Sequence, residues 1–255
     1  MDLGLAGRRA LVGGGGAGIG NGIASVLAAE GATVALIGRT GDRVRAEAER
    51  LGGVPIAADL ALPEGPASAV EAAVTAMGGL DLLLVNTGGP PGGTFETLGE
   101  AEWEAAIAGT LQSTLRLVRA ALPHLRAGRD PAILVVLSSS VRLPIPDLTT
   151  SNVLRPGLAG LVKTLTAEIA PIRINGIAPG RIATDRIAWL DSRRAEKAGI
   201  TREEFARRFA AGIPLGRYGE LVEIGRVGAF LLSPAASYVT GAIVPVDGGM
   251  VLSLP

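Results

Sequence analysis

The sequence of 255 residues contains no cysteine and one histidine, His124. Disulfide bonds, thiolate chemistry and a metal site built on histidines are therefore excluded. No apolar run approaches the roughly 18 residues that a membrane span needs, and the N-terminal residues lack the uninterrupted apolar segment of a signal peptide. We expect a cytoplasmic protein with no metal site and no membrane partner.

An excess of charge of either sign is also lacking, because 24 basic residues balance 24 acidic ones. This balance argues against a nucleic-acid partner. Hydrophobic residues make up 48% of the chain, which suits one α/β domain with a large core. We therefore expect residues 1–255 to form a single domain.

Glycine is abundant near the N-terminus. Residues 10–12 are apolar, five of the next six residues are glycine, and an apolar helical pattern begins at Ile19. A strand that enters a helix through glycines brings the backbone close to an anion and points the free N–H groups of the helix at it. The pattern predicts a dinucleotide diphosphate site, with Gly14, Gly16, Gly18, Ile19 and Gly20 as contacts. The alternative is a glycine-rich turn that binds nothing.

Short apolar runs alternate with longer helical patterns along the rest of the chain. This alternation predicts a Rossmann-like, doubly wound parallel sheet in three αβα layers. Seven strands are expected, at residues 10–12, 33–37, 54–59, 80–86, 132–137, 173–178 and 243–246. Helices are expected to end at Gly31 and to cover 43–51, 67–77, 100–125 and 221–232, with a helical insertion at 185–213.

Arg39 follows the second predicted strand, where this fold places the residue that meets the adenosine ribose. An arginine there can pair with a 2′-phosphate, whereas a carboxylate would accept hydrogen bonds from a free 2′-hydroxyl. We therefore expect NADP(H) to be favoured over NAD(H); a solvated arginine stacked on adenine is the alternative. Asp59 at the end of the third strand and Leu60 just after it are candidates for contact with adenine, although Asp59 could instead cap the next turn.

Several further motifs occur in order, at Asn86-Thr87-Gly88-Gly89, Pro179-Gly180-Arg181-Ile182-Ala183-Thr184, Gly216-Arg217, Ser237-Tyr238-Val239-Thr240-Gly241 and Asp247-Gly248-Gly249. With these motifs the chain resembles the short-chain dehydrogenase/reductases, and among them the 3-oxoacyl-acyl-carrier-protein reductases, over nearly its whole length. The resemblance implies further cofactor contacts from Asn86, Gly88, Arg155, Pro179, Gly180, Ile182 and Thr184. It also implies a homotetramer or homodimer.

The catalytic positions depart from that family. Ser138, Ser139 and Ser140 follow the fifth strand, and one of them should replace the family's carbonyl-binding serine; the register favours Ser139, then Ser138. The family's Tyr-x-x-x-Lys aligns with Ser151 and Arg155, and its catalytic asparagine aligns with Thr110. The sequence thus predicts an atypical site in which the usual proton donor is missing.

Three functions remain open. The first is an NAD(P)-dependent oxidoreductase acting on a carbonyl or alcohol, possibly of 3-oxoacyl type: Ser151 and Ser139 bind the carbonyl oxygen, Arg155 anchors the nicotinamide ribose, and water or the substrate supplies the proton. The second is a catalytically silent dinucleotide-binding sensor or scaffold. The third is a non-redox enzyme that has kept the pocket.

The resemblance implies that the insertion at residues 185–213 covers a small-molecule substrate and moves as a lid. Trp189 and Leu190 are candidate apolar contacts. Arg181, Arg186, Arg193 and Arg194 are candidates to receive a carboxylate or phosphate, or else belong to a solvated helix face.

Overall fold

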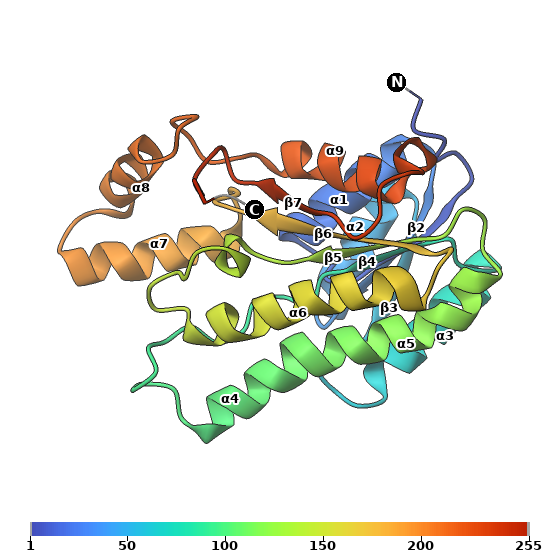
Figure 1. Ribbon diagram of the computed structural model, residues 1–255, viewed down its shortest axis with the longest axis horizontal. Coiled ribbons are helices and arrows are strands. Elements are labelled where there is room, and N and C mark those ends of the chain that lie inside the picture. The colour runs from blue at the N-terminus through green and yellow to red at the C-terminus, as the bar shows by residue number, and fades with distance from the viewer. Residues whose placement is uncertain (1, 254–255) are drawn as a thin grey trace.

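A computed structural model describes residues 2–253 of the chain. One parallel sheet of seven strands has the order β3-β2-β1-β4-β5-β6-β7 (Figure 1). The strands are β1 (Arg9–Val12), β2 (Thr33–Gly38), β3 (Val54–Ala57), β4 (Leu82–Val85), β5 (Ala132–Val136), β6 (Arg173–Pro179) and β7 (Ile243–Val246). The predicted doubly wound, Rossmann-like fold is confirmed.

Helices cover both faces of the sheet (Figure 1). One layer holds α1 (Gly18–Ala29), α2 (Gly41–Leu51) and α9 (Leu221–Leu232); the other holds α3 (Gly65–Met77), α4 (Glu100–Ala106), α5 (Ser113–Arg126) and α6 (Thr149–Glu168). Each face has its own buried cluster: Leu83 and Val85 of β4 face one, and Leu82 and Leu84 face the other. Because both faces of β4 are covered, this strand is apolar at every position.

The strand order fixes where a ligand can bind. The chain builds β1, β2 and β3 outward on one side, then crosses back to place β4 next to β1. In such sheets, ligands bind in the crevice beyond the carboxyl ends of the strands where the order reverses. The loops after β1 and β4 are therefore the expected walls of the site.

The long helix predicted at residues 100–125 is interrupted. A π-helical segment, η1 (Ile107–Gln112), lies between α4 and α5. Its wider turns shift the phase of the helix, so Thr110, Thr114, Leu117 and Ala121 are buried. Along this helical segment Val118 is buried, Leu115 is exposed, and the other spaced apolar residues, Trp103, Ile107, Leu111 and Leu122, are half-buried. The helix predicted at residues 100–125 is therefore present, with a π-helical interruption that its sequence did not indicate.

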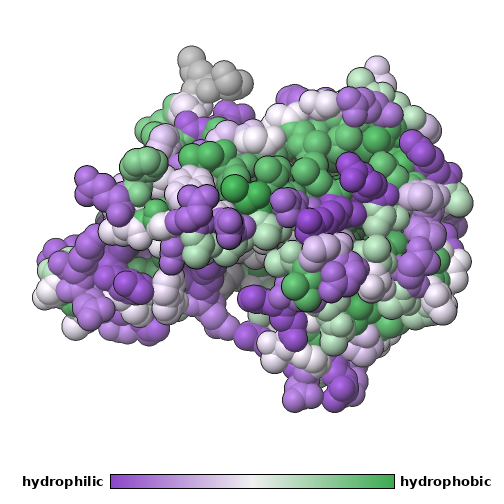
Figure 2. All heavy atoms as spheres, turned by 90° about the horizontal axis from the view of Figure 1, so that it is seen from below, coloured by the Kyte–Doolittle hydropathy of each residue, from purple (hydrophilic) through white to green (hydrophobic). Residues whose placement is uncertain are grey.

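Residues 185–213 contain two helices, α7 (Asp185–Ala198) and α8 (Arg202–Ala211), which project from one end of the sheet (Figure 1). The Thr184 and Thr201 hydroxyls cap them by accepting hydrogen bonds from the N–H groups of Ile187 and Glu204. Figure 2 shows this end, at the left, as a largely hydrophilic surface. Within residues 2–253 no helix combines the length and apolar character needed to cross a membrane.

Candidate functional site

The glycine-rich turn after β1 leaves no room for side chains. Gly14 and Gly18 have φ values of +60° and +56°. A Cβ on Gly20 would lie 2.4 Å from the Gly14 carbonyl oxygen, and a Cβ on Gly14 would lie 2.6 Å from Nδ2 of Asn86. No side chain caps the start of α1, so the N–H groups of its first turn can bind a ligand. These residues fit the diphosphate of a dinucleotide, and the loop packs directly on Asn86 after β4.

Two arginines follow the carboxyl end of β2, beside the glycine-rich turn. Arg39 is exposed and makes no ion pair within residues 2–253. Arg43, which the sequence analysis missed, donates from Nε to the Gly16 carbonyl at 3.0 Å and pairs with Asp185 at 2.9 Å. Its position in the first turn of α2, just after Arg39, was the available signal.

In the structure Asp59 caps the turn that follows β3, which is the alternative to adenine binding given above. One carboxylate oxygen of Asp59 accepts a hydrogen bond from the N–H of Ala61 at 3.0 Å. The side chain of Leu60 is buried and packs in the core. Adenine contacts by these two residues stay predictions.

The segment from Pro179 to Thr184 joins β6 to α7 beside the glycine turn. A Cβ on Gly180 would lie 2.6 Å from Cβ of Asp247, and one on Gly18 would lie 3.7 Å from Cγ2 of Thr184. Ile182 is buried and bridges to Gly219. The second predicted cofactor motif therefore lies against the first.

Two serine hydroxyls meet beyond β5. Ser138 caps a short 3₁₀ turn, η2 (Ser139–Val141), by accepting a hydrogen bond from the Ser140 N–H. This turn places Oγ of Ser140 at 3.1 Å from Oγ of Ser151, with both residues buried. The hydroxyl of Ser139 makes no hydrogen bond within residues 2–253. Ser140 rather than Ser139 contacts Ser151, because the chain leaves strand geometry at Ser138 and the alternation of side chains ends there. Carbonyl binding by Ser139 or Ser138 stays a prediction.

Arg155 follows Ser151 by one turn of α6 and is 5% exposed. It donates to the carbonyl oxygens of Val136 and, at 2.8 Å, Gly88. Its Nε is the only buried side-chain nitrogen or oxygen within residues 2–253 that has no hydrogen-bond partner. Burial, with a smaller effect of the charge on Arg186, lowers the pKa of Arg155 to about 10. Arg155 thus ties the ends of β4 and β5 together and stays a cation at neutral pH.

Thr110 is buried in η1, which packs against α6. Its carbonyl accepts a hydrogen bond from the Thr114 hydroxyl at 2.8 Å. No hydrogen bond joins Thr110 to Ser140 or Ser151 within the described residues. A catalytic role of Thr110 stays a prediction.

The loop between η2 and α6 is held by two side chains that the sequence analysis did not single out. Asn152 accepts from the N–H of Ile145 and donates to its carbonyl, both at 2.9 Å. Thr150 donates to the Pro91 carbonyl at 2.6 Å. These bonds fix the start of α6, and with it Ser151, between the loops that follow β4 and β5. Their closeness to Ser151 in sequence was the available signal.

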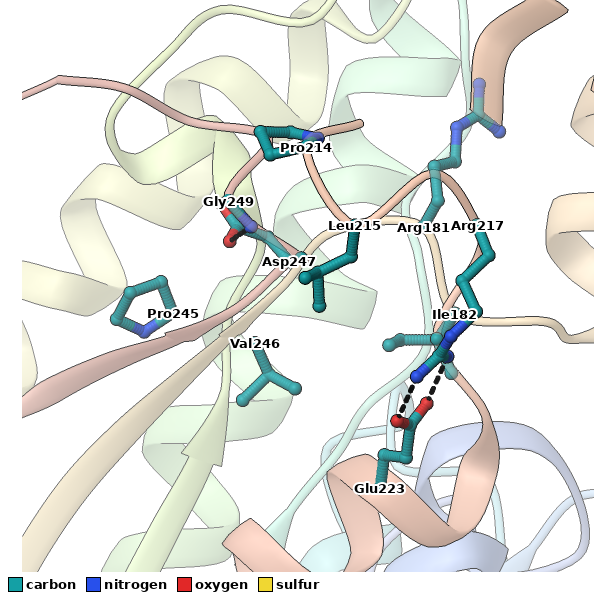
Figure 3. A pocket seen from close by; sticks show the side chains of 12 residues that line it. Arg181, Ile182, Pro214, Leu215, Arg217, Glu223, Pro245, Val246, Asp247 and Gly249 are labelled. Carbon is teal, nitrogen blue, oxygen red and sulfur yellow. Dashed lines mark hydrogen bonds and ion pairs between the residues drawn. The ribbon is translucent and has the colours of Figure 1, made fainter. Parts of the chain in front are cut away.

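Two hollows lie beside the predicted cofactor motifs. One, of about 590 Å³, is lined by Gly16, Gly18, Arg43, Thr184 and Asp185 among others. The other, of about 440 Å³, lies at the edge formed by β7, and Figure 3 shows Arg217 and Glu223 paired on its wall. The first hollow contains predicted cofactor residues, whereas neither hollow is lined by Ser140, Ser151 or Arg155.

The family model described as Enoyl-(Acyl carrier protein) reductase matches residues 14–251. The chain belongs to the short-chain dehydrogenase/reductase family. A 3-oxoacyl-[acyl-carrier-protein] reductase of Aquifex aeolicus is 32% identical over 261 residues, covering 98% of this chain and 100% of the relative. The predicted family is therefore confirmed.

Solved structures of short-chain dehydrogenases/reductases superpose closely on this chain. L-sorbose reductase of Gluconobacter frateurii, complexed with NADPH and L-sorbose, has a TM-score of 0.93 at 30% identity, with 100% of both chains covered. A short-chain oxidoreductase of Pseudomonas aeruginosa, NADPH bound and containing an atypical catalytic center, has a TM-score of 0.87 at 29% identity, with 98% and 99% covered. The family is one of oxidoreductases, and NADPH binds within it.

Proposed function

We propose that this short-chain dehydrogenase/reductase is an NADP(H)-dependent oxidoreductase of carbonyl or alcohol substrates, with Ser151 and Arg155 in place of the family's Tyr and Lys. The observation that carries the proposal is the buried contact of 3.1 Å between the Ser140 and Ser151 hydroxyls, one helical turn from the Arg155 cation. A hydroxyl pair beside a buried cation suits a carbonyl oxygen that gains negative charge.

The cofactor would be held along the carboxyl ends of the strands. Gly14, Gly16, Gly18, Ile19 and Gly20 would hold the diphosphate, Arg39 and Arg43 the 2′-phosphate, and Asn86, Gly88, Pro179, Gly180, Ile182 and Thr184 the nicotinamide half. When bound, the reduced nicotinamide supplies two electrons and one hydrogen to the carbonyl carbon. The protein must then stabilise the oxygen and allow it to gain a proton.

The serine pair provides the oxygen with hydrogen-bond donors. One hydroxyl donates to the substrate oxygen and the other donates to the first, so both O–H groups are used. A serine hydroxyl ionises far less readily than a phenol, whose pKa is about 10, so the pair orients and stabilises the oxygen while water delivers the proton. Losing a positioned general acid costs about 10² to 10⁴ in rate, and we expect a slow enzyme.

The related Pseudomonas aeruginosa oxidoreductase supports this reading, because it binds NADPH and contains an atypical catalytic center. Arg39 is exposed and has no ion pair within residues 2–253, which supports NADP(H) over NAD(H). A substrate of 3-oxoacyl type, a cytoplasmic location, a single domain over residues 1–255 and a homotetramer or homodimer remain part of the proposal.

The test has two stages. NADPH and NADH are titrated by cofactor fluorescence, and single-turnover transfer is then followed over a panel of ketones and alcohols. We expect tighter binding of NADPH and slow but measurable transfer. Tight binding of NADPH with no transfer to any ketone or alcohol would instead favour the silent sensor.

A further inference from the structure

Two guanidinium groups donate hydrogen bonds to the loop that follows β4. Arg155 donates to the Gly88 carbonyl at 2.8 Å, and Nη2 of Arg186, in the first turn of α7, donates to the Pro90 carbonyl at 2.9 Å. A Cβ on Gly89 would lie 2.4 Å from Cζ of Arg186. The guanidinium of Arg186 therefore lies against the bare backbone of Gly89, the residue between the two carbonyls that the cations bind.

No carboxylate neutralises either cation within residues 2–253. Burial lowers the pKa of both arginines, and the charge on Arg186 lowers that of Arg155 further. Arg155 is buried, whereas Arg186 is exposed, so an anion can reach the Arg186 guanidinium and would reduce the repulsion between the two like charges. The surface beside Gly89 thus carries positive charge that a ligand can use.

The other candidate arginines are engaged elsewhere. Arg181 is buried in an ion pair of 2.8 Å with Asp191 and lies over the Phe209 ring. Arg193 lies over the Trp189 ring, and Arg194 donates to the Pro146 carbonyl. Nε and Nη1 of Arg186 make no hydrogen bond within the described residues, so this guanidinium keeps N–H groups that can donate to a ligand.

We infer that Arg186 binds the carboxylate of an oxo-acid substrate whose carbonyl oxygen is held by Ser140 and Ser151. This inference rests on the proposed function and adds the substrate class. The reacting carbonyl and the carboxylate would belong to one short molecule, because Arg155 reaches Gly88 from beside Ser151 while Arg186 reaches Pro90, two residues away. A neutral ketone would leave the charge of Arg186 unmatched.

The cofactor diphosphate is the competing ligand for Arg186. The glycine turn would hold the diphosphate, because no side chain caps the start of α1 and Gly14 and Gly20 pack closely on Asn86. Gly89 and Pro90 lie three and four residues beyond Asn86, toward the serine pair. This separation favours the substrate as the partner of Arg186.

The kinetic test compares each acid with its neutral ester in the presence of NADPH: acetoacetate with methyl acetoacetate, and pyruvate with methyl pyruvate. We expect kcat/KM to be at least about tenfold higher for an acid than for its ester. Arg186→Gln should lower kcat/KM for the acid by about 30-fold, as expected when one partner of a hydrogen-bonded charge pair is removed, and should change that for the ester less than about twofold. Arg193→Gln, on the same helix, is the matched control and should leave both unchanged.

A binding test separates this inference from the proposed function. Calorimetry with NADP⁺, which cannot reduce an oxo acid, should show acetoacetate binding that Arg186→Gln abolishes. Such binding without turnover of any substrate supports the inference and overturns the proposed function. Equal affinity for acid and ester, or a loss of NADP⁺ affinity in Arg186→Gln with an unchanged preference for acid over ester, overturns the inference.

Discussion

At the scale of single residues, the serine pair separates two assignments. Ser140 contacts Ser151 at 3.1 Å, whereas the Ser139 hydroxyl has no partner within residues 2–253. We expect Ser140→Ala and Ser151→Ala each to reduce single-turnover transfer about 10²-fold or more, as when a donor to a developing oxyanion is removed. Ser139→Ala should change the rate less than about threefold. A larger loss in Ser139→Ala than in Ser140→Ala would return the role to Ser139.

Arg39 decides a second residue-scale prediction. Because its guanidinium is exposed and unpaired in the described structure, Arg39→Asp should remove a partner of the 2′-phosphate and place a carboxylate near it. The ratio of NADPH to NADH affinity should fall about tenfold or more, since a charge-assisted hydrogen bond is lost and repulsion is added. Cofactor fluorescence titration measures this ratio. Arg45→Asp, on the exposed side of α2, is the control, and an equal change in both variants would reject the phosphate assignment.

At the scale of elements, most of the fold could be predicted from the sequence. The helix at 221–232 and the strand at 243–246 begin and end where expected, because their apolar periodicity meets clear breaks. The helix at 100–125 could not be predicted in full, because η1 depends on packing against α6 and no residue in 107–112 forces a π turn. The same applies to Ser140, whose direction follows from the cap that Ser138 provides.

The glycine turn gives an element-scale prediction. A Cβ on Gly20 would collide with the Gly14 carbonyl at 2.4 Å, so Gly20→Ala must push the turn away from α1. We expect about 1 to 3 kcal/mol of destabilisation and a clear loss of NADPH affinity. Gly160→Ala in α6, where a Cβ would meet nothing within 4 Å, should instead stabilise the helix by about 0.5–1 kcal/mol. Denaturant unfolding and cofactor titration of both variants test the contrast.

The ion pair that anchors α7 gives a second prediction at the scale of elements. Arg181 and Asp191 form a buried ion pair, and the Tyr218 hydroxyl also donates to Asp191 at 2.9 Å. Burial, with that hydrogen bond, raises the pKa of Tyr218, so the phenol stays protonated. Asp191→Asn leaves the Arg181 charge buried without its partner, which typically costs about 3–5 kcal/mol. Proteolysis between α7 and α8 should accelerate, whereas Tyr218→Phe, which removes one neutral donor, should have a smaller effect.

At the scale of the whole molecule, the two ends of the parallel strands carry different kinds of residue. The carboxyl ends of the strands carry the serines, Arg155 and the glycine turn. Asp81 lies at the amino ends of the strands, just before β4. Its carboxylate pairs with Arg9 of β1 at 2.8 Å and accepts a hydrogen bond from the Arg129 N–H at 2.8 Å. Stability and cofactor binding should therefore respond to different substitutions.

Asp81 makes that separation measurable through pH. Burial alone would raise the pKa of Asp81, but hydrogen bonds from Arg9 and from backbone N–H groups outweigh it and lower the pKa to about 2. Because the folded-state pKa is below the unfolded value of about 3.9, the stabilisation is complete above pH ~4 and is lost as the pH falls toward ~2. The linkage amounts to about 2 kcal/mol.

We expect Asp81→Asn to lower the free energy of unfolding at pH 7 by about this amount and to flatten its pH dependence between pH ~4 and ~2. NADPH affinity should stay unchanged, because Asp81 lies at the amino ends of the strands, away from the predicted cofactor residues at their carboxyl ends. Urea unfolding at several pH values, with fluorescence titration at pH 7, provides both readouts. Asp185→Asn, in an exposed pair with Arg43, is the control and should leave the acid limb as in the wild type. If the free energy of unfolding of Asp81→Asn falls as steeply at acid pH as that of the wild type, other carboxylates cause the pH dependence. A loss of NADPH affinity would show that the two ends of the strands are coupled.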